Sequence, residues 1–499
     1  MIWLVAKKEC HAHLISLRFT TGSVILLALV ALFTFVLVDK YSARQDSYNQ
    51  LVDRNNEELQ GTMTYQNLRP TVFRAPEPLA IFSAGLSGDQ VESAEVSIGS
   101  VPTAGGGFLD GNPLLGVFQD LDISTIFQLV VTVLVFLLVY DSVSGEKENR
   151  TLSLVLSQGG TRHQVLLGKL AGCLISIAVP LTLAFLAAGL ILQFSPAVSL
   201  PAADWGRIVL MYAASLLLAA TFCSFGLLVS ALTRRAADTL ILLFFFWVLT
   251  VVVVPDCAGS LAERFQPAIP AEKLESDIQA LESDMLKELI SLYRQNRLPG
   301  SVSDDNEPWG YYHRWGDRSA ILADLKRKGL IEPMRAGYAE RKWQVRKEYL
   351  ESLRTQEHTA ALIALLSPAA AYESVISGLA CTDMPNTDRF YEQARLYRVQ
   401  LLDYLREIQA LSSLRYVTTS SLEQLNDPGT GGDYFALRDR IFEQKVEPLD
   451  LSSMPRFVLQ RESLRESLFR TGPGIVLLFF SALIFYFCAH IAFSRYDVR

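Results

Sequence analysis

Six long apolar runs, nearly free of charged residues, constrain the fold of this chain more than any other feature. They cover residues 20–38, 123–140, 170–192, 207–232, 239–255 and 472–493. Each is about long enough to cross a bilayer, because about 20 helical residues span its hydrocarbon core. Half of all residues are hydrophobic and only 19% are charged, and the charges avoid these runs. The sequence therefore predicts an α-helical membrane protein with six transmembrane helices.

The distribution of basic residues predicts which side each connection faces. The connection at 141–169 contains four basic residues, Lys147, Arg150, Arg162 and Lys169. Basic residues in short loops are retained on the cytoplasmic side. The very short connection after residue 232 agrees, because it carries Arg234 and Arg235. With an even number of spans, residues 1–19 and the tail at 494–499 are both expected in the cytoplasm.

Residues 1–19 mix apolar and basic positions, and we expect them to form an amphipathic elbow ahead of the first span. A secretory signal peptide also begins with a basic segment and an apolar run. No small-residue cleavage site follows the run at 20–38. That run is therefore interpreted as an uncleaved span.

Two segments are expected outside. Residues 39–122 begin as a polar helical stretch and continue as a loop rich in Gly, Pro and Ser, with strand-like pieces. Residues 256–471 hold acids and bases in near balance, with no run long enough to cross a bilayer. In this part Leu274, Ile278, Leu281 and Met285 recur at spacings of three and four, the period of a helix. The predicted architecture is six transmembrane helices with a large, mainly α extracytoplasmic domain before the last span.

The cytoplasmic connection at 141–169 has an unusual composition for a loop. Apolar clusters at 152–156 and 165–167 are flanked by Ser, Gly and charged residues. This pattern is typical of short amphipathic helices that lie on a membrane face, available to a cytoplasmic partner. An idle amphipathic connection is the alternative.

The same connection carries a resemblance to a known family. It contains S-G-E-K-E-x-x-T-L-x-L-x-L-S followed by T-R-x-x-x-L-L-G-K, which resembles the segment after the second span of ABC type-2 transporter permeases. In that family the segment is the coupling surface, which docks on an ATP-binding subunit made as a separate chain. The resemblance implies this role for Ser144, Gly145, Glu146, Lys147, Glu148, Thr151, Leu152, Arg162, Gly168 and Lys169. Arg150 belongs to the same predicted site, at a position where the family usually has glycine.

A second stretch narrows the resemblance. Residues 366–405, and the pattern P-x-P-L-x-I-F-S-x-G at 76–85, resemble a subgroup of these permeases with a large helical insert before the last span. The subgroup includes permeases associated with gliding motility and with copper-enzyme maturation. In these relatives the position of Cys381 is commonly glycine.

The six cysteines are interpreted from the predicted topology. Cys173, Cys223 and Cys488 fall inside apolar runs and are expected to be small buried hydrophobic residues. Cys257 and Cys381 are both placed outside. A disulfide between them is one hypothesis, and two free thiols in a helical core is the other.

No catalytic, cofactor or metal site is expected in this chain. There is no Walker-type glycine loop, since Gly168 and Lys169 are followed by Leu170 and lack the upstream glycine. No H-E-x-x-H motif or nucleophile elbow occurs. His11 and His13 lack a third ligand nearby and are interpreted as surface residues. No basic run or aromatic platform suggests nucleic acid, and ATP is expected to be bound by a partner subunit.

The resemblance predicts the membrane-spanning subunit of an ABC type-2 exporter with unknown substrate. It implies two permease subunits, identical or different, with two ATP-binding subunits, embedded in lipid in a bacterial inner membrane. The alternative is a non-transporting scaffold that relays ATP-driven motion to an envelope partner through residues 256–471. An intramembrane enzyme would need a catalytic pair in the spans, and none is visible in the sequence.

Overall fold

The computed structural model describes residues 1–85, 91–103, 122–152, 161–295, 318–419 and 447–495, with the backbone alone over 318–320. Helices dominate these parts, and the two short strands form one small antiparallel sheet. Six helical segments are long and apolar enough to cross a membrane: Leu17–Gln60, Ile123–Glu148, Arg162–Phe194, Ala202–Leu232, Ala236–Phe265 and Leu464–Arg495. The predicted class, an α-helical membrane protein with six spans, is confirmed.

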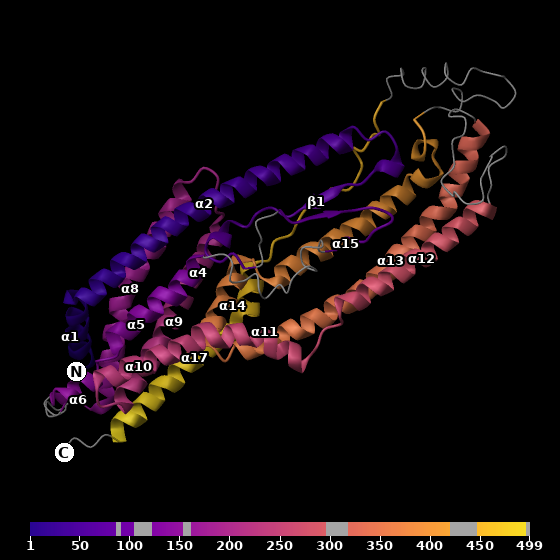
Figure 1. Cartoon of the computed structure of the whole chain (residues 1–499). Coiled ribbons are helices and arrows are strands. Elements are labelled where there is room, and N and C mark those ends of the chain that lie inside the picture. The colour runs from indigo at the N-terminus through magenta and orange to yellow at the C-terminus, as the bar shows by residue number, and fades with distance from the viewer. Residues whose placement is uncertain (86–90, 104–121, 153–160, 296–317, 420–446, 496–499) are drawn as a thin grey trace.

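The chain begins with α1 (Ile2–Ile15), followed by α2 (Leu17–Gln60). Between them the side chain of Ser16 accepts a hydrogen bond from the Phe19 amide, which caps the start of α2. A helix of 44 residues is about 66 Å long, roughly twice the thickness of the hydrocarbon core. Figure 1 accordingly shows α2 leaving the helical bundle and continuing well beyond it.

Two of the spans contain a π-helical segment. The second span consists of α4 (Ile123–Ile126), the π-helix η4 (Phe127–Val131) and α5 (Thr132–Val139), followed by the short helix α6 (Ser144–Glu148). The fifth consists of α10 (Ala236–Trp247), the π-helix η5 (Val248–Val253) and α11 (Val254–Phe265). The indole of Trp247 donates to the hydroxyl of Thr132 at 2.8 Å. Both distorted segments therefore lie beside one hydrogen bond between neighbouring spans.

The other spans are continuous helices: α8 (Arg162–Phe194), which contains Pro180, then α9 (Ala202–Leu232) and α17 (Leu464–Arg495). The N-terminus, α6 and the end of α17 lie at one end of the bundle (Figure 1). We call this the α6 end.

Beyond the opposite end of the bundle lies a distal region. It contains η1 (Tyr65–Asn67), β1 (Thr71–Phe73), β2 (Ser93–Glu95), α12 (Ala271–Gln295), α13 (Arg318–Ala364), α15 (Met384–Glu407), η6 (Ala410–Ser412) and η7 (Leu414–Tyr416). The helices α12, α13 and α15 extend away from the bundle in Figure 1. Val72, Phe390, Tyr397 and Leu401 belong to a hydrophobic core of this region, separate from that of the bundle.

One helix between α13 and α15 does not belong to the distal region. Helix α14 (Pro368–Ala380) packs against α9 and α17 and also contacts η2 (Pro78–Ile81). The hydroxyl groups of Tyr372 and Ser215 are 2.9 Å apart. A Cβ atom on Gly474 would lie 2.8 Å from Val375 Cγ2, so this glycine allows α14 and α17 to approach closely. The expected external domain at 256–471 is thus divided, because an apolar helix of 13 residues inside it joins the bundle core.

A candidate coupling site at the α6 end

The start of α6 is held by side chains from two spans. The amides of Val143 and Ser144 both donate to Ser230 Oγ of α9 at 3.0 Å. Ser230 in turn donates to the Tyr140 carbonyl at 3.1 Å. Thr239 of α10 bonds to the Ser144 hydroxyl at 3.0 Å. A five-residue helix satisfies few of its own amides, and Ser230 of the neighbouring α9 supplies an acceptor for two amides at its start.

Lys147 and Glu148 bind the ends of two consecutive spans. The Lys147 ammonium donates to the carbonyl groups of Ala231 and Thr233, the latter at 3.0 Å, at the end of α9. The Glu148 carboxylate accepts from the Ala236 amide at 3.1 Å, at the start of α10. A cation at a helix C-terminus and an anion at an N-terminus both complement the helix dipole. The two side chains thus connect α6 to the turn between the fourth and fifth spans.

Lys169 is more deeply buried than its two charged partners in the site, Glu9 and Glu146. Its ammonium lies 2.9 Å from Glu9 Oε1, 2.8 Å from Glu146 Oε1 and 2.8 Å from the Ser142 carbonyl, with 2% of its side chain exposed. A buried charge is tolerated when it is paired and fully hydrogen-bonded. These contacts join α1, α6 and α8. The second oxygen of Glu146 is buried and has no hydrogen-bond partner among the described residues.

Two glycines explain why α1 lies directly against α8. A Cβ atom on Gly168 would lie 2.7 Å from Val5 Cβ and 2.9 Å from the Ile2 carbonyl oxygen. A Cβ atom on Gly172 would lie 2.8 Å from Glu9 Cβ. Glycines four residues apart let helices approach closely in a membrane. The close approach also brings Glu9 within reach of Lys169.

The start of α8 is also joined to the last span. The Arg162 guanidinium donates to the carbonyl groups of Phe493 and Ser494, at 3.2 Å for Phe493. These are orphan carbonyls of the last turn of α17, which favour a cation. The start of α8 and the end of α17 are therefore tied together at the α6 end.

A left-handed residue ends α6. Arg150 has φ 55°, its amide donates to the Lys147 carbonyl at 3.2 Å, and the Thr151 amide donates to the Glu146 carbonyl at 3.0 Å. This pair of bonds is the Schellman motif, whose left-handed position is usually glycine. The resemblance implies glycine at position 150, and the left-handed backbone at this position favours glycine.

Comparison with known families decides what kind of protein carries this site. The model of the family described as "ABC-2 family transporter protein" matches residues 3–498. The chain belongs to the ABC-2 transporter family. A search among curated proteins gives no significant match. As a member of that family the chain is a membrane-spanning transport subunit, of a kind that is generally non-catalytic and works with an ATP-binding subunit.

The predicted coupling residues of this permease differ in their burial. Ser144, Leu152 and Lys169 are buried, and Glu146 and Lys147 are partly buried with their charged atoms on neighbouring helices. Glu148, Arg150 and Thr151 are exposed, together with Asn149. Gly145 and Arg162 are half-buried. Residues 153–160 of the predicted segment lie outside the described residues.

Sequence reasoning missed three residues of the site in the permease. Glu9, Ser230 and Thr239 come from α1, α9 and α10, far from the motif along the chain. The acid at position 9, inside a basic elbow, is the one available signal. His13 was interpreted as a surface residue, which is wrong: it is buried, with Nδ1 3.2 Å from the Ser176 hydroxyl. Within the described ranges no group of three or more His, Cys, Asp or Glu is arranged to hold a metal ion.

The hypothetical disulfide is not formed in the structure of the permease. Cys257 and Cys381 are both free thiols, the first exposed on α11 and the second buried after α14. Arg207 of α9 donates to the Cys381 sulfur, and Arg74 donates to the Cys381 carbonyl at 2.7 Å. The Cys381 thiol therefore lies within a polar network, and it is not bonded to Cys257. Cys173 and Cys223 are buried as expected, but Cys488 is exposed on α17.

That polar network joins the spans to the distal region. Arg461 lies 2.6 Å from Glu77 Oε2 and 3.3 Å from Asp204 Oδ2 at the start of α9. Arg470 of α17 lies 2.6 Å from Glu462 Oε2. These ion pairs are mostly buried, and breaking such a pair is strongly destabilising. Asn386 of α15 donates to Glu462 Oε2 at 3.0 Å, and the network thereby connects the distal region to α9 and α17.

A carboxyl cluster lies nearby, where α14 meets the start of the second span. Glu373 accepts from Ser83 at 2.9 Å, from Ser124 at 2.6 Å and from Gln128 at 2.6 Å. Ser124 also donates to Asp122 at 2.9 Å. Burial, assisted by the charge of Asp122, raises the pKa of Glu373 to about 7. Among the described residues, the hydrogen-bond partners of the two carboxyl groups are all neutral: Ser83, Ala84, Ser124, Thr125 and Gln128.

Proposed function

We propose that this chain is the permease subunit of an ABC-2 exporter, which couples ATP hydrolysis by a separate ATP-binding subunit to export or extraction of a substrate. The observation that supports this proposal is the bonding of α6. Its side chains and backbone contact α8, α9, α10 and, through Lys169, α1. A force applied to α6 is therefore transmitted directly to the ends of three spans.

In this mechanism the exposed residues from 148 to 151 meet the ATP-binding subunit, and the buried residues transmit its motion. Lys147 and Glu148 move the turn between α9 and α10, while Lys169 moves α8 together with the elbow helix α1. The partner biases the permease only if its ATP-bound and ATP-free states bind α6 differently. At the other end, the ion pairs of Arg461 and Arg470 carry the movement of α9 and α17 into the distal region.

The proposed assembly contains two permeases, identical or different, and two ATP-binding subunits. The proposed location is a bacterial inner membrane, with the α6 end and both termini in the cytoplasm. The arginines and lysines of the α6 end support this orientation, because basic residues are retained on that side. Position Cys381, which the subgroup with a helical insert usually fills with glycine, has the left-handed backbone that favours glycine, which supports the relation to that subgroup.

The test is purification of the tagged permease from its native membranes in mild detergent, followed by mass spectrometry and an ATPase assay. We expect an ATP-binding subunit in the wild-type sample and its loss from a double variant, Arg150→Glu with Thr151→Arg. The matched control is Arg54→Glu, an exposed charge reversal on the distal half of α2, which should keep the subunit. A wild-type sample free of ATPase activity would refute the proposal.

A scaffold that relays ATP-driven motion to an envelope partner is the second candidate. It is favoured by the length of α13, whose 47 residues extend about 70 Å. The two candidates differ in whether the spans open a path for cargo. In cysteine-free variants carrying single cysteines along α5, such as Thr132→Cys, labelling by an impermeant maleimide should depend on ATP if the spans open. ATP-independent protection along the whole of α5 would favour the scaffold.

A further inference from the structure

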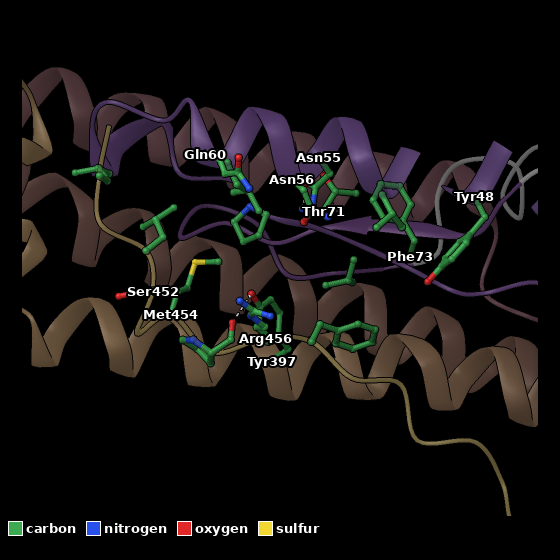
Figure 2. A pocket seen from close by; sticks show the side chains of 18 residues that line it. Tyr48, Asn55, Asn56, Gln60, Thr71, Phe73, Tyr397, Ser452, Met454 and Arg456 are labelled. Carbon is green, nitrogen blue, oxygen red and sulfur yellow. Dashed lines mark hydrogen bonds between the residues drawn. The ribbon is translucent and has the colours of Figure 1, made fainter. Parts of the chain in front are cut away.

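A groove in the distal region has no role in the proposed function. It has a volume of about 660 Å³ and lies between the distal half of α2, the strand β1 and the segment at 449–457. Figure 2 shows Asn55, Asn56 and Gln60 on its α2 side and Met454 and Arg456 on the opposite side. A volume of this size is typical of ligand sites.

The strand β1 faces this groove with the edge that does not pair with β2, and Asn55 binds only part of that edge. Bonds to β2 are made by alternate residues, since the Val96 amide donates to the Pro70 carbonyl and the Arg74 amide to the Glu92 carbonyl, both at 2.9 Å. Thr71 and Phe73 therefore direct their backbone groups to the other edge. Asn55 Oδ1 accepts from the Thr71 amide at 3.0 Å. Within the described residues, the Phe73 amide makes no hydrogen bond.

The side walls of the groove are apolar and aromatic with amide groups between. On α2, Tyr48, Val52, Asn56 and Leu59 follow one another at helical spacing along the groove. Phe457 lies on the opposite wall. An open strand edge between such walls is the arrangement that receives an extended peptide as an added strand, with alternate side chains entering pockets.

The charge of Arg456 indicates which kind of peptide would bind in the groove. Among the described residues that line the groove, Arg456 is the only charged one. It is exposed and forms no ion pair within the described parts of the chain. An arginine in this position favours a carboxylate, which it can bind through two parallel hydrogen bonds.

We propose that this groove binds an extended segment of a second protein, which adds a strand to β1 and places an acidic side chain or a C-terminal carboxylate at Arg456. From Tyr48 to Gln60 the wall on α2 is about 18 Å long, which accommodates about five residues of extended chain. The proposal goes beyond transport: binding requires no ATP-binding subunit, and only the compartment of the bound protein depends on the proposed orientation.

The test uses the purified full-length permease in lipid nanodiscs, without any partner, and a phage library that displays random linear peptides of eight residues. We expect enriched peptides with alternating apolar residues and at least one Asp or Glu. A fluorescent version of the most enriched peptide should bind, measured by anisotropy. Arg456→Glu should weaken binding about tenfold or more, as expected for loss of a charge-assisted contact.

Two further variants show whether a loss of binding comes from the groove itself or from misfolding of Arg456→Glu. Asn56→Trp fills the groove from an exposed helical position and should abolish binding, and Phe73→Pro removes the free strand amide and should do the same. Arg406→Glu reverses an exposed charge on α15 outside the groove and should leave the affinity unchanged. Absence of enrichment, or equal binding to the wild type, Arg456→Glu and Asn56→Trp, would overturn the proposal. Loss of the ATP-binding subunit from purified samples would leave it intact.

Discussion

Arg150 and Cys381 occupy equivalent positions in two unrelated turns of the permease. Both have a left-handed backbone, with φ 55° and 61°, and both follow a helix whose last carbonyls they help to satisfy. The Cys381 amide donates to the Gly378 carbonyl at 3.4 Å and the Thr382 amide to the Ser377 carbonyl at 3.1 Å, the same pair of bonds found after α6. The resemblance seen in the sequence implies glycine at both positions. One backbone requirement thus accounts for both expected glycines.

Replacement of Arg150 by glycine should stabilise the permease. A left-handed conformation costs about 1–2 kcal/mol in a residue with a Cβ atom, part of which the greater entropy of unfolded glycine offsets. We expect Arg150→Gly to raise the midpoint of thermal unfolding in detergent slightly. Arg150→Val should lower it, because a β-branched side chain tolerates this conformation poorly. Identical midpoints for both variants would contradict the assigned turn.

Loss of Lys169 should unfold the α6 end. Lys169→Met leaves the carboxylates of Glu9 and Glu146 buried without their cation, which destabilises by about 3–5 kcal/mol. The matched control is Lys287→Met, which removes an exposed ion pair with Asp284 and should have little effect.

The expected rescue separates charge from packing. The triple variant Glu9→Gln, Glu146→Gln, Lys169→Met removes all three charges and should recover much of the lost stability. Thermal unfolding of the purified permease measures each step. If Lys169→Met were as stable as Lys287→Met, the buried triad would have no structural role.

The contact between α1 and α8 can be tested with one methyl group. Gly168→Ala places a Cβ atom 2.7 Å from Val5 Cβ, and we expect destabilisation of about 1–3 kcal/mol from overpacking. Because α1 then separates from α8, ATPase activity of the purified complex should fall as well. Gly329→Ala in α13 is the control, since no atom lies within 4 Å of the added Cβ. It should be neutral or stabilising by up to about 1 kcal/mol.

The six spans were predictable because bilayer thickness imposes a minimum length on each apolar run. The position of the proposed coupling site was predictable from a long motif at residues 144–169. The direction of its side chains was not, because the motif cannot show that Lys169 meets Glu9 or that Lys147 reaches the end of α9. Such contacts join residues that only the folded bundle brings together.

Two further features could not be predicted for the same reason. The predicted topology placed Cys257 and Cys381 on one side of the membrane, but it says nothing of their separation or burial. Likewise, residues 256–471 were predicted as one external domain because they contain no run long enough to cross a bilayer, and the 13 residues of α14 lie within them. Its apolar face packs against α9 and α17 without crossing, as the contact between Tyr372 and Ser215 shows.

The Glu373 cluster predicts how the stability of the permease depends on pH. Because the pKa of Glu373 is raised from 4.5 to about 7 in the folded protein, the folded state holds a proton that the unfolded chain releases earlier. The raised pKa of Glu373 therefore costs no free energy of unfolding below about pH 4.5. As the pH rises toward 7, the free energy of unfolding decreases, by about 3 kcal/mol at most. Glu373→Gln keeps the shape of the side chain without the ionisation. We expect it to raise the unfolding midpoint at pH 8 and to change it little at pH 5, while the exposed control Glu58→Gln changes neither. Equal shifts at both pH values would show that Glu373 acts through packing and not through its proton.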